Sequence, residues 1–329
     1  MSTYLGIEIG GTKLQLGVSA GDGSPLLALE RREVDIARGA QAIRDDIVAA
    51  GLELKNRFDI KAVGFGFGGP IDAKAGVITA SHQVQGWDGF PIVKWCEEAL
   101  GLPVFLGNDC DMAALAEARF GAGRGSRCVF YVTVGTGIGG GLVIDGQVHG
   151  SDRPAAAEPG HLTPRHAPDG RAVEWQAGGT SLARRDREMV EAILSQRETA
   201  REQSHAADAV HTDDLLQRAS STLTTLTARQ LADAASAGNT LALRILRTGT
   251  DALGWAIAQV ITLIAPDTIV VGGGVSLMGE SLFYKPLRET VARHVFAPLR
   301  GSFEIVVPAL GEEVVVHGAA AMARSRTQP

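Results

Sequence analysis

Two polar residues, Asn108 and Asp109, follow the apolar run "PVFL" and precede a helical pattern. An acidic residue at the start of a helix is often only a cap. Ligands of α/β folds, however, bind at the carboxyl ends of strands. A carboxylate in that position can accept the proton of a hydroxyl group that attacks phosphorus, which accelerates such a step by about 10²–10⁴-fold. We therefore predict that one residue of the pair has a chemical role and the other a structural one.

A second candidate is the turn Gly10, Gly11, Thr12 and Lys13, which separates the apolar runs "LGIEI" and "LQLGV". Glycines let backbone N–H groups approach phosphate oxygens, and Thr and Lys add a hydroxyl and a charge. Gly-Gly between two strand-like runs is also an ordinary hairpin signal. The pattern is neither a Walker loop nor a Rossmann fingerprint. The local sequence leaves both interpretations open.

Two further glycine-rich segments favour phosphate binding. "VTVGTGIGGGLVIDG" holds more glycine than a hairpin needs, and "DTIVVGGGVS" is a strand that runs into glycines, where a flat base or ribose could lie against bare backbone. Two such loops on two lobes could hold a triphosphate between them. The sequence thus predicts a nucleotide cleft, with these candidate residues: Gly135, Thr136, Gly137, Gly272, Gly273 and Gly274.

A polar segment at 158–181 supplies Glu158, His161 and Glu174. Carboxylates and a neutral imidazole suit hydrogen bonding to a ring of sugar hydroxyls. A surface loop with scattered polar residues is an equally good interpretation of this segment by itself.

Strands and helices that must position these residues alternate along the chain, which indicates an α/β fold. We expect a β-meander over 4–36, a helix over 39–57, a buried strand at 62–70, and a second strand–glycine–strand unit over 128–149. Helices are expected over 174–264, strands at 267–276 and 303–310, and a closing helix at 317–326. The two meanders, one in each half, predict two similar lobes. We interpret 184–230 as solvated helices with a mobile connection around 198–212.

Composition narrows the class of partner. The chain has 329 residues and a formal net charge of −6, and no dense run of Lys and Arg occurs. That balance argues against nucleic acid or an anionic membrane as the main partner. Three scattered cysteines and no signal peptide are typical of a cytoplasmic protein. The apolar stretch 252–266 is shorter than a typical membrane span, so we expect a buried helix there.

Taken together, the motifs resemble those of the ROK family (repressors, open reading frames and sugar kinases). The resemblance runs nearly end to end, through "GIEIGGTK", "GFGFGGPID", "GND", "TVGTGIGGG", "EPGH", "IVVGGGVS" and "HGAAAMA". It implies a two-lobed actin-like ATPase (ribonuclease H-like) fold with mixed sheets flanked by helices. The expected lobes are 1–118 with a returning helix at 313–329, and 119–312.

The resemblance also implies an activity, namely ATP-dependent phosphorylation of a hexose, glucokinase- or fructokinase-like, with Mg²⁺. An amino-sugar kinase acting on N-acetylmannosamine or N-acetylglucosamine is the alternative. By resemblance, Gly10–Lys13 and Gly135–Gly140 would bind the phosphates and Gly272–Gly274 the adenosine end. Asp109 would be the base, and the sugar would be held by Gly69, Asn108, Glu158, His161 and Glu174. Family members commonly form homodimers or homotetramers.

Three departures from the family pattern stand out. Glu8 occupies the position of a usual Asp that faces the metal, often through water. Arg165, Ala167 and Ala172 occupy the cysteine positions of the family's zinc motif, so a tetrahedral zinc site cannot be built and His161 would be only a sugar contact. The sugar loop reads "SHQVQGWDGF", with His82, Gln83 and Gln85 in the region of a usual Asn, so the sugar cannot be assumed to be glucose.

Two rival functions come from other classes. A sugar-responsive repressor, also found in the family, would need a helix-turn-helix before the first strand, and this chain begins that strand at about Tyr4. A non-catalytic sugar-binding protein would fit Glu8 and the altered sugar loop, and the intact Asp109 argues against it.

Overall fold

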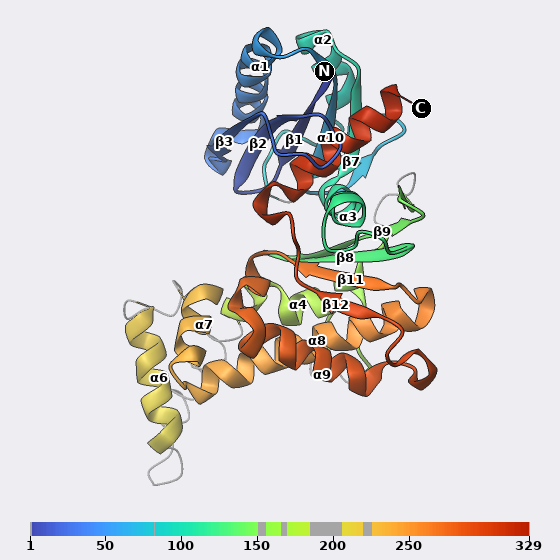
Figure 1. Cartoon of the computed structure of the whole chain (residues 1–329). Coiled ribbons are helices and arrows are strands. Elements are labelled where there is room, and N and C mark those ends of the chain that lie inside the picture. The colour runs from blue at the N-terminus through green and yellow to red at the C-terminus, as the bar shows by residue number, and fades with distance from the viewer. Residues whose placement is uncertain are drawn as a thin grey trace.

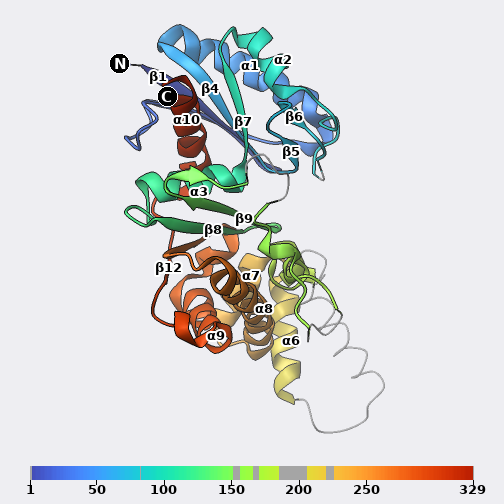
Figure 2. The same cartoon turned by 90° about the vertical axis from the view of Figure 1, so that its right-hand side faces the viewer.

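The computed structural model describes residues 2–81, 83–150, 156–165, 170–184, 206–219 and 226–328. Two five-stranded mixed sheets lie one above the other, and helices α3 (Asp109–Phe120) and α10 (Val314–Thr327) pack between them (Figure 1). Figure 2 shows further helices on the outer faces of the two sheets. On one sheet these are α1 (Gly39–Arg57) and α2 (Ile92–Leu100), and on the other α8 (Thr240–Ile264) and α9 (Lys285–His294). The predicted fold class, α/β with mixed sheets flanked by helices, is confirmed.

The upper sheet has the strand order β3-β2-β1-β4-β7. The strands are β3 (Ala28–Glu33), β2 (Lys13–Ser19), β1 (Thr3–Ile9), β4 (Ile60–Phe67) and β7 (Val104–Asn108). β1 pairs antiparallel with β2 and parallel with β4, and β4 pairs parallel with β7. Side chains from α1 (Gly39–Arg57) and α2 (Ile92–Leu100) pack on one face, with Ile43, Ile47, Cys96 and Leu100 buried against the strands.

The lower sheet repeats this arrangement with the order β10-β9-β8-β11-β12. The strands are β10 (Gln147–Val148), β9 (Ile138–Ile144), β8 (Cys128–Val134), β11 (Thr268–Gly272) and β12 (Glu304–Val306). β8 pairs antiparallel with β9 and parallel with β11, as β1 does with β2 and β4. The matching hydrogen-bond pattern explains why the two meanders look alike in sequence.

Glycines allow the layers to approach closely. A side chain at Gly6 in β1 would meet the backbone of Val316 in α10, and one at Gly318 in α10 would meet the backbone of Met112 in α3. The second glycine loop is shorter than predicted, because some of its glycines lie in a strand and allow another segment to pack closely. β9 begins at Ile138, so Gly140 lies in a strand, where a side chain would meet the carbonyl of Ala157. Only residues 135–137 form the turn.

The helices expected over 174–264 are present as several separate elements. They include α4 (Val173–Ala177), α6 (Ala206–Arg218), α7 (Ala228–Ser236) and α8 (Thr240–Ile264). The apolar stretch at 252–266 belongs mostly to α8 and is largely buried, which confirms the predicted buried helix. Within the prediction for 184–230, residues 185–205 and 220–225 lie outside the described ranges. Of the helices described, none combines the length and apolarity that a membrane crossing requires.

Several elements were missed or predicted with the wrong length. A single turn of π-helix, η5 (Glu280–Tyr284), leads into α9 (Lys285–His294), and the sequence analysis predicted neither. The expected strand over 303–310 is confined to the three residues of β12. A two-stranded ribbon, β5 (Ile71–Asp72) with β6 (Val77–Ile78), was also not predicted.

Candidate active site

Asn108 takes the structural role that the sequence analysis expected of one residue of the pair. The side chain of Asn108 caps α3 by accepting hydrogen bonds from the backbone N–H groups of Cys110 (2.8 Å) and Asp111 (3.3 Å). Its amide nitrogen makes longer bonds, 3.4 Å, to the backbone carbonyl of Gly69 and to that of Phe67. Asn108 therefore caps two of the first backbone N–H groups of α3.

The carboxyl group of Asp109 is hydrogen-bonded to its sequence neighbours Asn108 and Cys110. Oδ1 accepts from the N–H of Cys110 at 2.8 Å, and Oδ2 lies 3.1 Å from where a Cβ of Gly68 would stand. Burial raises the pKa of Asp109 above its ordinary value. A carboxylate with a raised pKa is a better proton acceptor than an ordinary surface Asp.

Other carboxyl groups surround Asp109. Burial, together with the charges of Asp109 and Glu174, raises the pKa of Glu158 to about 7, and His161 opposes that rise. Burial and the charges of Asp109 and Glu158 raise the pKa of Asp111 to about 7. The structure therefore brings three other predicted site residues, Asp109, His161 and Glu174, into electrostatic reach of Glu158. It adds Asp111, which the sequence analysis missed although it lies two residues beyond Asp109 in the first turn of α3.

Glu174 contacts the second glycine turn. Its Oε2 accepts a hydrogen bond from the N–H of Ile138 at 2.7 Å, and a side chain at Gly137 would meet the same oxygen. The turn is closed by a bond from the N–H of Gly135 to the carbonyl of Gly137 (2.9 Å), and the side chain of Thr136 is exposed. These contacts place a predicted sugar ligand against a predicted phosphate loop.

The first glycine turn joins β1 to β2. The N–H of Gly10 donates to the carbonyl of Lys13 at 3.0 Å, which makes residues 10–12 a tight hairpin turn. Nζ of Lys13 forms an ion pair with Oε1 of Glu8 (3.2 Å) and donates to the carbonyl of Glu312 (3.2 Å). The side chain of Gln83 packs directly on Gly11, which brings the sugar loop against this turn. His82, the neighbouring residue of that loop, lies outside the described ranges.

The third glycine turn follows β11 and lies beside the second turn. Gly273 has φ +90°, and a Cβ there would be 2.6 Å from the backbone N and O of Val134, the residue before Gly135. No heavy atom lies within 4 Å of the position that a Cβ of Gly274 would take. The structure therefore brings the second and third predicted nucleotide segments together.

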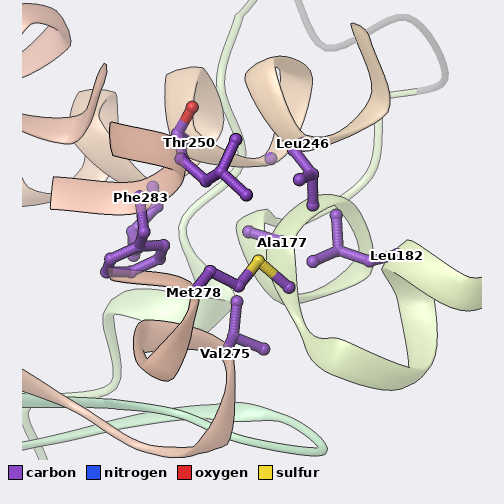
Figure 3. Close-up of a pocket in the computed structure, with 10 residues that line it drawn as sticks. Ala177, Leu182, Leu246, Thr250, Val275, Met278 and Phe283 are labelled. Carbon is purple, nitrogen blue, oxygen red and sulfur yellow. The ribbon is translucent and has the colours of Figure 1, made fainter. Parts of the chain in front are cut away.

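A small apolar pocket adjoins the third turn (Figure 3). Val275 and Met278 of the short 3-10 helix η4 (Gly274–Met278) line it, together with side chains from α4, α8 and η5, including Phe283. The hydroxyl of Thr250 donates to the carbonyl of Arg247 at 3.0 Å, so it is already paired. Because its lining is almost entirely apolar, the pocket suits an apolar group more than a charged one.

Glu8 is the predicted metal-facing residue. It is only 6% exposed, and burial raises its pKa to about 7 although Lys13 lowers it. The charge of Asp109 also raises the pKa of Glu8, so the two carboxyl groups lie near each other. Mg²⁺ is usually held by one or two carboxylates with water and substrate phosphates, so this pair fits it.

A metal site built from protein side chains alone would need several clustered ligands. Within the described ranges, no group of three or more His, Cys, Asp or Glu side chains is arranged to hold a metal ion. Of the three positions that replace the zinc cysteines, Arg165 and Ala172 are described and Ala167 lies outside the described ranges.

Two lobes of matching topology, glycine turns at their strand ends and an acidic cluster at the start of α3 define a protein of the actin-like ATPase fold. The ROK family model matches residues 4–326, and the chain belongs to the ROK family. This confirms the resemblance predicted from the motifs.

Individual relatives cover nearly the whole chain. A glucokinase from Thermotoga maritima is 31% identical over 98% of this chain and 97% of its own. The ROK family glucokinase of Streptomyces griseus, solved with glucose and AMPPNP, superposes with a TM-score of 0.79 at 29% identity, covering 98% of this chain and 99% of that chain. The ROK hexokinase of Thermus thermophilus gives a TM-score of 0.77 at 29% identity, covering 99% of each chain.

Proposed function

We propose that this protein is an ATP-dependent sugar kinase that transfers the γ-phosphate of ATP to a hydroxyl group of a hexose. The observation that carries the proposal is the carboxyl group of Asp109, which lies directly after β7 with a raised pKa and with Oδ2 beside Gly68. Membership of the ROK family and the glucokinases among its relatives support the same activity. Glucose is accordingly the first substrate to test.

In the proposed reaction, Asp109 accepts the proton of the sugar hydroxyl as its oxygen attacks the γ-phosphorus. The bond from that phosphorus to the bridging oxygen breaks, and ADP leaves with the electron pair. Mg²⁺, held on the Glu8 side, would neutralise charge on the phosphates. The sugar would be oriented by hydrogen bonds to five residues: Gly69, Asn108, Glu158, His161 and Glu174.

The nucleotide would lie across the three glycine turns. Residues 10–13 and 135–137 would contact the phosphates through backbone N–H groups, as loops of this kind do. Residues 272–274 would face the adenosine, and the apolar pocket beside Val275 is a candidate for its base. Two findings support this placement, namely the contact of Gly273 with Val134 and the exposed side chain of Thr136.

Several finer points are part of the proposal. The lobes would be 1–118 with 313–329, and 119–312, because α10 packs on β1 and β4 of the upper sheet. A homodimer or homotetramer and a cytoplasmic location follow from the family resemblance and the cysteine usage. The sugar loop around Gln83 keeps amino-sugar kinase activity as the second candidate, since its polar side chains differ from the family pattern.

ATP turnover against a panel of sugars tests the proposal. The panel contains glucose, fructose, mannose, allose, N-acetylglucosamine and N-acetylmannosamine, and Asp109→Asn is measured in parallel. We expect turnover with one or two sugars and a loss of about 10²–10⁴-fold in kcat in the variant, with ATP affinity kept. No turnover with any sugar, or full activity of Asp109→Asn, would overturn it.

A further inference from the structure

Gln15 is a buried amide in the middle of an apolar strand. Its side chain is 1% exposed, although it lies between the core residues Leu14 and Leu16. The antiparallel register of β1 and β2 sets Gln15 directly opposite Glu8, and Nε2 of Gln15 donates to Oε2 of Glu8 at 3.0 Å. A cross-strand pair of this kind fixes both side chains in one geometry.

The remaining atoms of the Gln15 amide are also held. Nε2 donates to the carbonyl of Glu312 at 3.1 Å, and Oε1 accepts from Nε of Arg31 at 3.2 Å. Arg31 in turn pairs with the carboxylate of Glu313. Glu312 and Glu313 belong to the short helix η7 (Gly311–Glu313), from which α10 begins. Besides its bond to Glu8, the Gln15 amide is therefore held by Arg31 of β3 and by the turn at the start of α10.

The second oxygen of Glu8 has its own partner. Oε1 pairs with Nζ of Lys13 at 3.2 Å, and Lys13 also donates to the carbonyl of Glu312. Each carboxylate oxygen of Glu8 thus has one fixed partner. The Lys13 side chain is 41% exposed beside the first glycine turn, whereas Gln15 is enclosed, so only Gln15 is shielded from a bound phosphate.

We propose that Gln15 is a positioning residue for Glu8. The inference rests on the proposed function, in which Glu8 faces the magnesium ion of bound ATP. Glu has one more rotatable bond than Asp, so its carboxylate needs a rigid partner to stay in place. Gln15 is such a partner because Arg31 and Glu312 hold its amide. Partners that orient a metal-facing side chain typically change metal affinity or activity by about 10–100-fold when they are removed.

The test is a double-mutant cycle with Gln15→Met and Glu8→Asp. Met keeps the length and packing of Gln15 and removes its hydrogen bonds. Two quantities are measured: the dissociation constant of Mn²⁺ for the complex of the protein with a non-hydrolysable ATP analogue, by electron paramagnetic resonance, and kcat with KM for sugar. Gln259→Met is the matched control, because the Gln259 amide donates to the carbonyl of Trp255, one turn earlier in α8 and far from Glu8 in the fold.

We expect Gln15→Met to weaken Mn²⁺ binding and to lower kcat by about 10-fold or more, with KM for sugar within about twofold. In the Glu8→Asp background the shorter carboxylate no longer reaches Gln15, so the same change should cost less than about threefold. An equal loss in both backgrounds, or an unchanged Mn²⁺ affinity, would overturn the inference. Failure of the proposed function would instead appear as an inactive wild type, and the Mn²⁺ titrations would still decide the role of Gln15. A variant that does not fold is replaced by Gln15→Leu in the same cycle.

Discussion

Glu174 and Ile138 are joined by a 2.7 Å hydrogen bond from the backbone N–H of Ile138 to Oε2 of Glu174. Ile138 is the first residue of β9, directly after the second glycine turn, and Glu174 lies in α4. One carboxylate oxygen of Glu174 therefore holds the turn proposed for phosphate binding, and under the proposed function its other oxygen would bind the sugar. The two substrates would share a residue.

This shared residue predicts a difference between two substitutions. Glu174→Ala removes a charged hydrogen bond worth about 1.5–3 kcal/mol, which corresponds to a rise in KM for ATP of roughly 10-fold or more. Glu174→Gln keeps an acceptor oxygen for Ile138, so KM for ATP should stay within about threefold. KM for sugar should rise in both variants. Steady-state kinetics with each substrate varied in turn measure these values, and equal KM values for ATP in the two variants would contradict the shared role.

Gly273→Ala should destabilise the fold. The backbone at Gly273 has φ +90° and ψ 168°, a region open almost only to glycine, and a Cβ would stand 2.6 Å from the backbone of Val134. We expect the free energy of unfolding, measured by urea titration, to fall by at least about 2 kcal/mol. Gly274→Ala is the control, because a Cβ there meets no atom within 4 Å. If both variants lose the same stability, the close approach to Val134 is not the cause.

The accuracy of the secondary-structure predictions depended on the type of sequence pattern on which each one rested. The span of α1 was predicted to the residue, because its apolar stripe of Ile43, Ile47 and Leu54 is regular. The glycines around 135–141 were predicted as a single loop, since composition cannot separate a turn glycine from one such as Gly140 that lets another segment approach. α9 was missed although Leu287 and Val291 carry a helical spacing.

Among the site residues, those within sequence motifs were predicted, and those that depend on long-range contacts were missed. Asp109 and Glu158 were predicted from motifs, and the structure places them in electrostatic reach of each other. Gln15 was missed because its role depends on the register of two strands and on Glu312, nearly three hundred residues away in the chain. A register prediction from the turn at residues 10–12 would have paired Gln15 with Glu8. No local signal would have found Glu312.

Glu117 should be among the most sensitive positions for stability. Its carboxylate on α3 is fully buried and accepts from the backbone N–H groups of Ala122 (2.7 Å), Ala309 (3.0 Å) and Leu310 (3.0 Å). Glu117→Ala would leave these donors unpaired at about 1–3 kcal/mol each, so the free energy of unfolding should fall by at least about 3 kcal/mol. Glu97→Ala, which changes an exposed Glu on α2, is the control and should stay within about 0.5 kcal/mol. A small loss at Glu117 would mean that water replaces it.

The raised pKa of Glu158 predicts a pH dependence of stability. Burial, chiefly, raises this pKa from 4.5 to about 7 in the folded protein. Between these values the folded state binds more protons than the unfolded state, so the free energy of unfolding falls as pH rises. Below pH 4.5 the group is protonated in both states and has no such effect.

Glu158→Gln removes this dependence. The variant should therefore gain stability relative to the wild type as pH rises from 4.5 to 7.5, by about 1–3 kcal/mol once partial exposure is allowed for. Loss of the Glu158 charge also lowers the pKa of Asp111, which adds to the gain in the same direction. Urea titrations of both proteins at several pH values measure the difference. A difference that is constant across this range would show that Glu158 has the same pKa in the folded and unfolded states. Glu97→Gln, on the exposed face of α2, controls for general charge effects.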